Sequence, residues 1–249
     1  MSTTQPVSSA PVGKLPKIGE ILTVSIEAAK KHFRVYAKVI LPYFGIMLLQ
    51  MLLGYLPDNA IKFVLWILIS LVSFAYAIWM GIILTRLSYQ AVTTGMVSME
   101  KAKQDLQAVI WPMFAVGLIS AVATFFGLFL FIVPGIVLAL MFFSAKFLAI
   151  IDQKNIGDSL RISIQMVKGR KWDLFVKLFV SLFLVGVIYY LAVIIVGIIF
   201  GVIGSSVSTD VGGILLVIGI LAISLPFTTV LVNIPTMIFS HLKKLNGMN

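Results

Sequence analysis

Few residues of this chain could perform acid–base or metal chemistry. His32 and His241 are its only histidines, and it contains no Cys. A metal site needs several converging His, Cys, Asp or Glu ligands, and phosphodiester hydrolysis needs histidines and carboxylates placed together. His32 lies among basic residues, and His241 directly follows the uncharged run that ends at residue 240. Neither histidine has several possible ligands or carboxylates around it in the sequence. We therefore predict a protein that is not an enzyme, with no catalytic residue, metal or cofactor.

Clustered cations are the side chains with the clearest binding chemistry. Guanidinium and ammonium groups bind phosphate oxygens, and the cations in question flank apolar segments. They are Lys30, Arg34, Arg161, Lys168, Arg170 and Lys171. We predict that they contact anionic lipid headgroups, with simple anchoring of the protein as the alternative. Asp152 and Asp158 lie beside them, either as helix caps or as part of the same headgroup pocket.

Asn233 and Pro235 interrupt an otherwise apolar segment. Pro235 has no N–H and frees a carbonyl group, while the amide of Asn233 can bond across helices or coordinate a solute. We predict an intramembrane break here, either in a transport path or as an ordinary packing kink.

These residues are positioned by long uncharged segments. The chain is 60% hydrophobic and 11% charged, far below the charge of a soluble domain. Its uncharged runs cover residues 39–57, 63–85, 106–145, 178–209 and 211–240. A membrane-crossing helix needs roughly 20 apolar residues. The sequence therefore predicts an all-α integral membrane protein.

The 106–145 run is too long for one crossing, and Pro134 with Gly135 predicts a tight turn that divides it. This gives six transmembrane helices in a single membrane domain at 14–245, after a disordered tail at 1–13. The predicted spans are residues 39–56, 63–85, 108–132, 136–151, 173–203 and 212–240. We expect the N-terminus to be retained, because the first apolar run begins too late for a signal peptide.

The charges predict the orientation of these spans. With six spans, 18 of the 19 Lys and Arg residues fall on one side, and Lys62 is the exception. The positive-inside rule places that side, with both termini, in the cytoplasm. This topology accounts for the net charge of +10, so we predict no nucleic-acid partner.

Two predicted amphipathic helices, at about 17–36 and 156–170, lie on the charged side. Residues 18–26 align without gaps on 156–164, with identity at Ile, Gly, Leu, Ser and Ile. A weaker recurrence relates 39–44 to 109–114. We therefore expect parallel internal repeats, each an interfacial helix followed by two spans in the same orientation.

The segment at residues 132–179 resembles a known family. Its Pro134-Gly135 pair precedes a short span that ends at Asp152. The tripeptide Lys168-Gly169-Arg170 lies at the end of the second amphipathic helix. This pattern resembles the glycerophosphoryl diester phosphodiesterase membrane-domain family and the related YciC-type bacterial inner-membrane proteins. The resemblance implies six spans in a bacterial-type plasma membrane. The phosphodiesterase domain that some relatives carry is missing from this sequence, so no such activity is implied.

The sequence favours a non-enzymatic polytopic membrane protein that organises lipid or partner proteins at the cytoplasmic interface. A small-solute or lipid transporter is the alternative. Anionic lipid is the expected partner, and protein partners cannot be read from the sequence. Gly197 and Gly201 have the G-x-x-x-G spacing that permits close helix approach. We expect packing within the chain there first, and a homo-oligomer contact second.

Overall fold

A computed structural model describes residues 14–207 and 209–248, and in these residues the fold consists of helices without strands. The predicted tail at 1–13 lies outside the described residues. The helices are α1 (Ile18–Lys31), α2 (Phe33–Leu53), α3 (Ala60–Thr94), α4 (Met99–Lys103), α5 (Leu106–Leu130), α6 (Ile132–Met141), α7 (Ala145–Ile151), α8 (Ile156–Val167), α9 (Lys171–Val207) and α10 (Thr209–Leu245).

The prediction of an all-α membrane protein is confirmed at this level. Six segments are long and apolar enough to cross a membrane: Phe33–Leu53, Ala60–Thr94, Leu106–Leu130, Ile132–Ile151, Lys171–Val202 and Leu215–Leu245.

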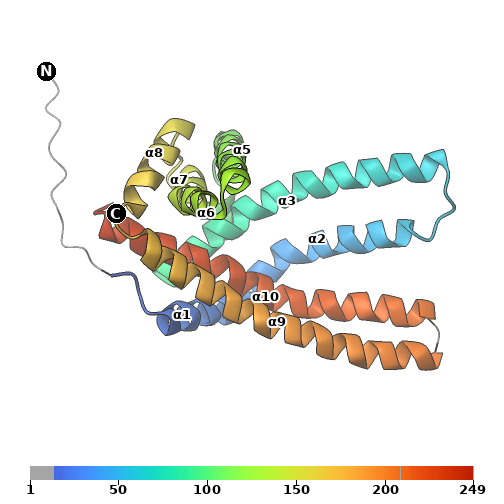
Figure 1. Cartoon of the computed structure of the whole chain (residues 1–249). Helices are drawn as coiled ribbons and strands as arrows, with labels where there is room; N and C mark the ends of the chain where they lie inside the picture. The colour runs from blue at the N-terminus through green and yellow to red at the C-terminus, as the bar shows by residue number, and fades with distance from the viewer. Residues whose placement is uncertain (1–13, 208, 249) are drawn as a thin grey trace, which may run out of the picture.

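Two of the helical hairpins, α2–α3 and α9–α10, extend in the same direction from one end of the molecule (Figure 1). We call that end the base. It contains α1, α4 to α8 and the C-terminal end of α10. The helices α3, α9 and α10 have 35, 37 and 37 residues. Such helices are about 50–55 Å long, whereas the hydrocarbon core is about 30 Å thick. They are therefore long enough to cross a bilayer and also to extend into the base.

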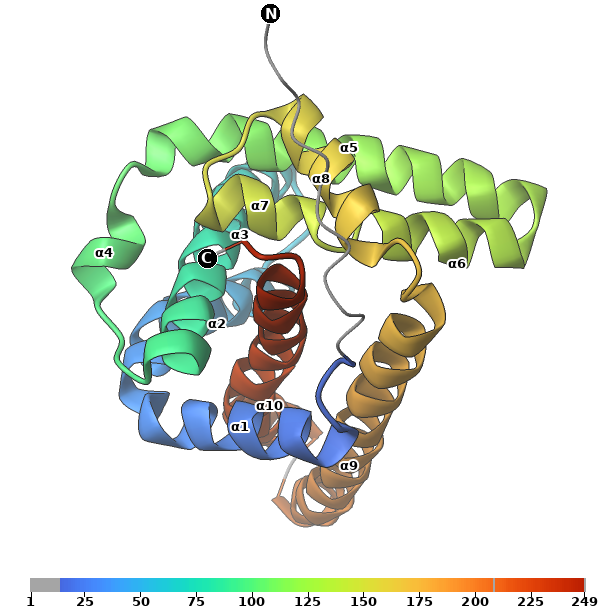
Figure 2. The same ribbon diagram turned by 90° about the vertical axis from the view of Figure 1, so that its left-hand side faces the viewer.

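The third hairpin, α5–α6, runs crosswise to the other two. It is seen end-on in Figure 1, where α2, α3, α9 and α10 lie lengthwise, and lengthwise in Figure 2, where those four are seen end-on. The helix α1 also runs crosswise. The three hairpins thus do not share one direction, and descent from a common repeat remains a prediction.

The reversal between α5 and α6 occurs at Phe131, so the predicted turn at Pro134-Gly135 is wrong. Phe131 is extended (φ −160°, ψ 148°) and is the only residue between the two helices. Pro134 lies in the first turn of α6, where its missing N–H breaks no helical bond. Gly135 instead allows close packing, because a Cβ there would clash with the side chain and backbone nitrogen of Leu128.

The span predicted at 136–151 is two helices. The helix α6 ends at Met141 and α7 begins at Ala145. Ser163 of α8 bridges the break, since its hydroxyl donates to the Met141 carbonyl at 2.7 Å and accepts from the Ser144 N–H at 3.1 Å. This side-chain bridge substitutes for helical hydrogen bonds at the interruption.

The predicted helix at 17–36 also ends early. It stops at Lys31, and the next helix begins at Phe33, so Tyr36 belongs to α2. One face of α1 is buried, with Ile21, Ser25 and Ala29 each at most 4% exposed. This face packs against α10 and not against lipid. The second predicted helix, at 156–170, ends at Val167 and buries Ser159, Ser163 and Met166.

The last two helices are longer than predicted. The predicted spans leave residues 204–211 between them, whereas α9 continues to Val207 and α10 begins at Thr209. Gly219 makes the close approach between them, because a Cβ there would lie 2.5 Å from the Phe200 ring. A Cβ on Gly197 or Gly201 would meet nothing within 4 Å. The first interpretation of the G-x-x-x-G pair, packing within the chain, is therefore wrong.

Candidate functional site

The amide of Asn233 joins four helices at the base. Its Oδ1 accepts from the Tyr36 hydroxyl at 2.9 Å and from the Ser88 hydroxyl at 2.6 Å, and its Nδ2 donates to the Ser25 carbonyl at 3.0 Å. All four residues are fully buried. The Asn233 side chain thus makes buried hydrogen bonds that join α10 to α1, α2 and α3. These bonds favour the interpretation of Asn233 as a packing residue.

Arg86, in the last third of α3, makes a second buried junction. Its Nε donates to the Ile150 carbonyl at 3.1 Å, and its Nη1 donates to the carbonyls of Ala102 and Gln104. Arg86 is 8% exposed. One side chain thereby connects α3 to the end of α7, to α4 and to the residue that follows α4. We call α5 to α7 the crosswise region, and Arg86 holds the chain at both of its ends.

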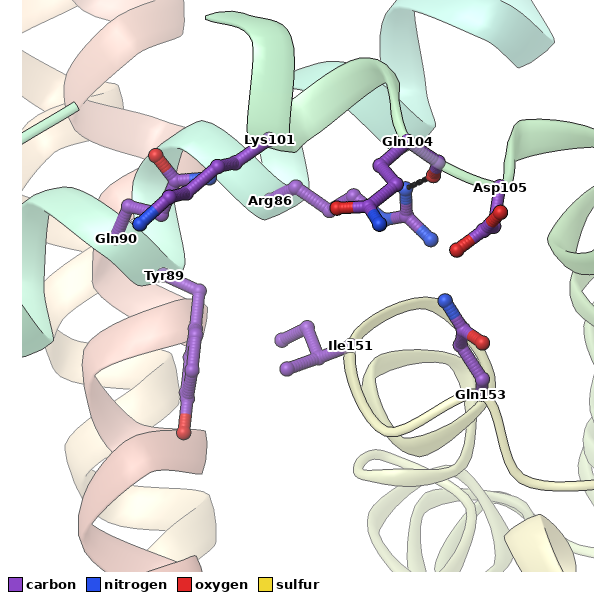
Figure 3. A pocket seen from close by; sticks show the side chains of 8 residues that line it. All are labelled: Arg86, Tyr89, Gln90, Lys101, Gln104, Asp105, Ile151 and Gln153. Carbon is purple, nitrogen blue, oxygen red and sulfur yellow. Dashed lines mark hydrogen bonds between the residues drawn. The ribbon is translucent and has the colours of Figure 1, made fainter. Parts of the chain in front are cut away.

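A polar cavity of about 350 Å³ lies beside this junction. We call it the Arg86 cavity, and its lining residues are Arg86, Tyr89, Gln90, Lys101, Gln104, Asp105, Ile151 and Gln153. In Figure 3 the guanidinium of Arg86 points between Asp105 and Gln153, while Lys101 and Gln90 lie at the other end. Two cations and one carboxylate give the lining a net charge of +1, which suits a small polar or anionic group.

The backbone is strained in the same lining. Asp105 and Gln153 both have φ of 50°, and within the described residues they are the only positive-φ positions that are not Gly. Such conformations cost about 1 kcal/mol or more and persist where the surroundings impose them. Next to Gln153, Asp152 pairs with Lys243 of α10 at 2.5 Å. Asp152 follows the last residue of α7, as predicted for a helix cap. Its ion pair with Lys243 also holds α7 against α10.

A second cavity, of about 390 Å³, lies between α3, α5, α7 and α10. We call it the Lys146 cavity, because Lys146 of α7 is the charged residue in its lining. The remaining lining is apolar except for Thr85, Thr228 and Thr236. Pro235 contributes to its wall. This site combines a single cation with a large apolar surface, as an amphiphilic anion requires.

The two cavities lie at different levels along α3. That helix begins at the far end of the molecule and ends at the base (Figure 1). Arg86, Tyr89 and Gln90 line the Arg86 cavity, whereas Met80 to Thr85 on the preceding turns contribute to the Lys146 cavity. Along α3, the Lys146 cavity is thus nearer the far end of the molecule, and the Arg86 cavity is nearer the end of α3 in the base.

The six predicted headgroup cations do not converge. Lys30 and Arg34 flank the α1–α2 junction, and the other four lie on α8 or at the α8–α9 junction. These junctions are on opposite sides of α10 in Figure 2. Lys30, Arg34, Arg161 and Lys168 are exposed, whereas Arg170 and Lys171 are partly buried. Contact with headgroups at separate points remains a prediction for these residues.

The remaining candidate residues have structural roles. His32 lies 3.2 Å from the Gly95 carbonyl, and His241 lies 3.1 Å from the Met237 carbonyl. Asp158 lies in the first turn of α8, as predicted, and exchanges hydrogen bonds of 2.8 Å with Asn155. Lys62 donates to the Gly54 and Leu56 carbonyls at the end of α2. This lone basic residue of the far end thereby caps a helix.

Sequence reasoning missed Arg86 and Lys146 as site residues. Arg86 directly follows the uncharged run at 63–85, and Lys146 directly follows the run at 106–145. In the sequence, both count only as basic residues that indicate the cytoplasmic side. A cation that directly ends such a run is the signal that could have found them.

No model of a known protein family matches this chain, and no curated protein or solved structure is found to be similar. The resemblance described above therefore remains a prediction.

Proposed function

We propose that this protein is a non-enzymatic membrane protein that organises lipid in one leaflet of a bacterial-type plasma membrane. In this proposal α2, α3, α9 and α10 cross the bilayer, and both termini are cytoplasmic. The α5–α6 hairpin lies along the cytoplasmic leaflet instead of crossing. The observation that carries the proposal is the direction of this hairpin relative to the other two.

The surface of the crosswise hairpin supports a lipid environment. Its tip projects beyond the other helices in Figure 2. Phe129, Phe131 and Ile132 at the tip are 79%, 73% and 71% exposed, and no charged residue occurs between 106 and 145. Exposed apolar surface of this extent is stable only in lipid or against a partner. A hairpin that inserts into one leaflet alone adds area to that leaflet and not to the other. Such a hairpin therefore favours membranes in which that leaflet is expanded.

The basic residues agree with the same placement. Eighteen of the 19 Lys and Arg residues lie just before α1, on α1, α4, α7 and α8, on the adjoining ends of the long helices, or in the segments that connect them. They surround the hairpin at the base, where anionic headgroups would neutralise them. The bonds of Asn233 to Tyr36, Ser88 and Ser25 give the transporter alternative no support from that residue.

Cysteine labelling tests the placement of the hairpin, because the chain has no native Cys. In intact cells, an impermeant maleimide should label Asp58→Cys at the far end and leave Phe131→Cys unlabelled. A fluorophore attached to the F131C variant should be quenched by lipids brominated along their acyl chains. Labelling of F131C from outside the cell would show that α5–α6 crosses the membrane, and the proposal would be wrong.

Membrane tubes pulled from giant vesicles test the function itself. The wild-type protein should concentrate in the tubes when its base lies in the outer, expanded leaflet. The double variant Phe129→Lys/Phe131→Lys carries charge at the hairpin tip and should lose this preference, since burial of Lys in hydrocarbon is unfavourable. Equal enrichment of both proteins would contradict a role for the hairpin.

A further inference from the structure

The Lys146 cavity has room that two glycines leave open. Gly81 of α3 and Gly117 of α5 both line it, and a Cβ on either residue would meet nothing within 4 Å. Met113 and Leu231 add apolar wall. A volume of about 390 Å³ accepts a headgroup and the first part of an acyl chain, but leaves whole chains outside.

The charge of this cavity is uncompensated. Within the described residues, no carboxylate lies within 4.0 Å of the Lys146 ammonium, and its recorded contact is with the Phe147 ring, 5.1 Å from the centroid. An unpaired ammonium in apolar surroundings is unfavourable, and a bound anion removes that cost. Pro235 also leaves the Leu231 carbonyl without its helical N–H donor, and both residues line the same cavity.

The level of the cavity matches that of lipid headgroups. The uncharged run of α3 at 63–85 has 23 residues, which corresponds to about 34 Å of helix and to the thickness of the hydrocarbon core. Gly81 and Thr85 of the cavity lie at the base end of this run. Lys146 therefore lies near the boundary between acyl chains and headgroups.

From this combination we infer that the Lys146 cavity binds one anionic phospholipid, with its phosphate at the Lys146 ammonium and its acyl chains along α3, α5 and α10. The inference rests on the proposed lipid function and names its ligand. Lys146 is exposed, as Arg161 and Lys168 are, but it lines this cavity and they do not. The inference therefore gives Lys146 a binding role that those two cations do not have.

Native mass spectrometry tests the inference on the full chain after exchange with vesicles of equal phosphatidylglycerol and phosphatidylethanolamine. We expect one retained phosphatidylglycerol per chain, and a tenfold or greater loss of affinity in Lys146→Gln, since one charge-assisted contact is removed. Gly117→Leu should also release the lipid by filling the cavity while it keeps the charge. Lys154→Gln and Gly45→Leu are the matched controls, because Lys154 is exposed like Lys146 but does not line the cavity, and Gly45 has open space outside it.

Several outcomes would overturn the inference. Retention of phosphatidylglycerol by K146Q, or equal loss in K154Q, would show that Lys146 does not select the lipid. Displacement of the lipid by millimolar inorganic phosphate would indicate a site for a free anion. Thermal melting of each variant identifies a folding defect, and Gly81→Leu then repeats the filling test from α3. A hairpin that crosses the membrane while K146Q still loses lipid would refute only the proposed function.

Discussion

The hairpins α5–α6 and α9–α10 have similar compositions and different directions. Both are formed from uncharged apolar runs, and each contains a glycine at the close approach of its two helices. The helices α9 and α10 run side by side away from the base, whereas α5–α6 runs across it. Hydropathy therefore accounts for the preference of both hairpins for lipid, and something else must determine their direction.

Length is one part of the difference. The helix α6 has 10 residues and is about 15 Å long, which is half of a hydrocarbon core. The helices α9 and α10 have 37 residues each. By itself α6 is therefore too short to cross, and the break at residues 142–144 separates it from α7. Residues 132–151 reach the length of a span only when the two helices are taken together.

Polar anchors are the other part. Arg86 bonds to Gln104, just before α5, and to Ile150, near the end of α7. Both ends of the crosswise region are thus held against α3. In contrast, the polar contacts of Asn233 and Lys243 anchor α10 at its base end. A segment held at both ends lies along the base, and a segment held at one end can extend away from it.

Replacement of the anchor at Arg86 should have the largest effect. Arg86→Ala leaves three carbonyls without their donor, and we expect a loss of about 4 kcal/mol in the free energy of unfolding. Unfolding in SDS mixed micelles measures this value. Amide hydrogen exchange should rise in α5 to α7 and stay unchanged in the outer part of α9–α10.

Arg161→Ala is the control for this prediction, because Arg161 is exposed on α8. It should change stability by about 0.5 kcal/mol or less. Uniform destabilisation of all helices in R86A would contradict the assignment of Arg86 to the crosswise region.

Replacement of Asn233 tests the anchor of the lengthwise hairpin. Asn233→Leu removes three buried hydrogen bonds, and we expect a loss of about 3 kcal/mol. Tyr36→Phe removes only one of them and should cost about 1 kcal/mol. Exchange should increase where α10 meets α1 and α2, while α5–α6 stays protected. The reverse pattern would show that the two anchors are not separate.

The glycine contacts allow a direct comparison of the two hairpins. A Cβ on Gly135 would lie 2.6 Å from the backbone nitrogen of Leu128, while a Cβ on Gly219 meets only the side chains of Phe200 and Val196. Backbone cannot move aside as a ring can, so Gly135→Ala should cost about 2 kcal/mol and Gly219→Ala less. Thermal melting of the two variants in one detergent measures the difference. Equal melting temperatures would refute the close packing of helix backbones assigned to Gly135.

The sequence was sufficient for the helices and insufficient for their directions. Uncharged runs predict six apolar segments of spanning length, since a span is recognised by the length and composition of its own residues. The turn between α5 and α6 was misplaced because Pro134 is tolerated at the start of a helix, and Phe131 carries no turn signal. The separation of α1 from α2 at His32 was missed for a similar reason, because the basic residues there continue a helical pattern.

The candidate sites were harder to predict than the helices. Asn233 was identified from its position in an apolar segment, but its partners Tyr36 and Ser25 are about 200 residues away in sequence. Arg86 and Lys146 depend on cavities formed by four or more elements. Only the packing of distant helices places these two cations in cavity linings, and a single sequence contains no record of that packing.

Ser163 should have the smallest effect, and it tests the break that shortens the crosswise hairpin. Ser163→Ala removes the bridge from Met141 to Ser144, and we expect a loss of about 1 kcal/mol. Ser159→Ala is the matched control, since its hydroxyl bonds to Lys154 beside its own helix at 3.3 Å. Amide exchange at residues 142–145 should increase in S163A alone. Equal exchange in the two variants would mean that the break persists without the bridge, and that the length of α6 is determined by its own sequence.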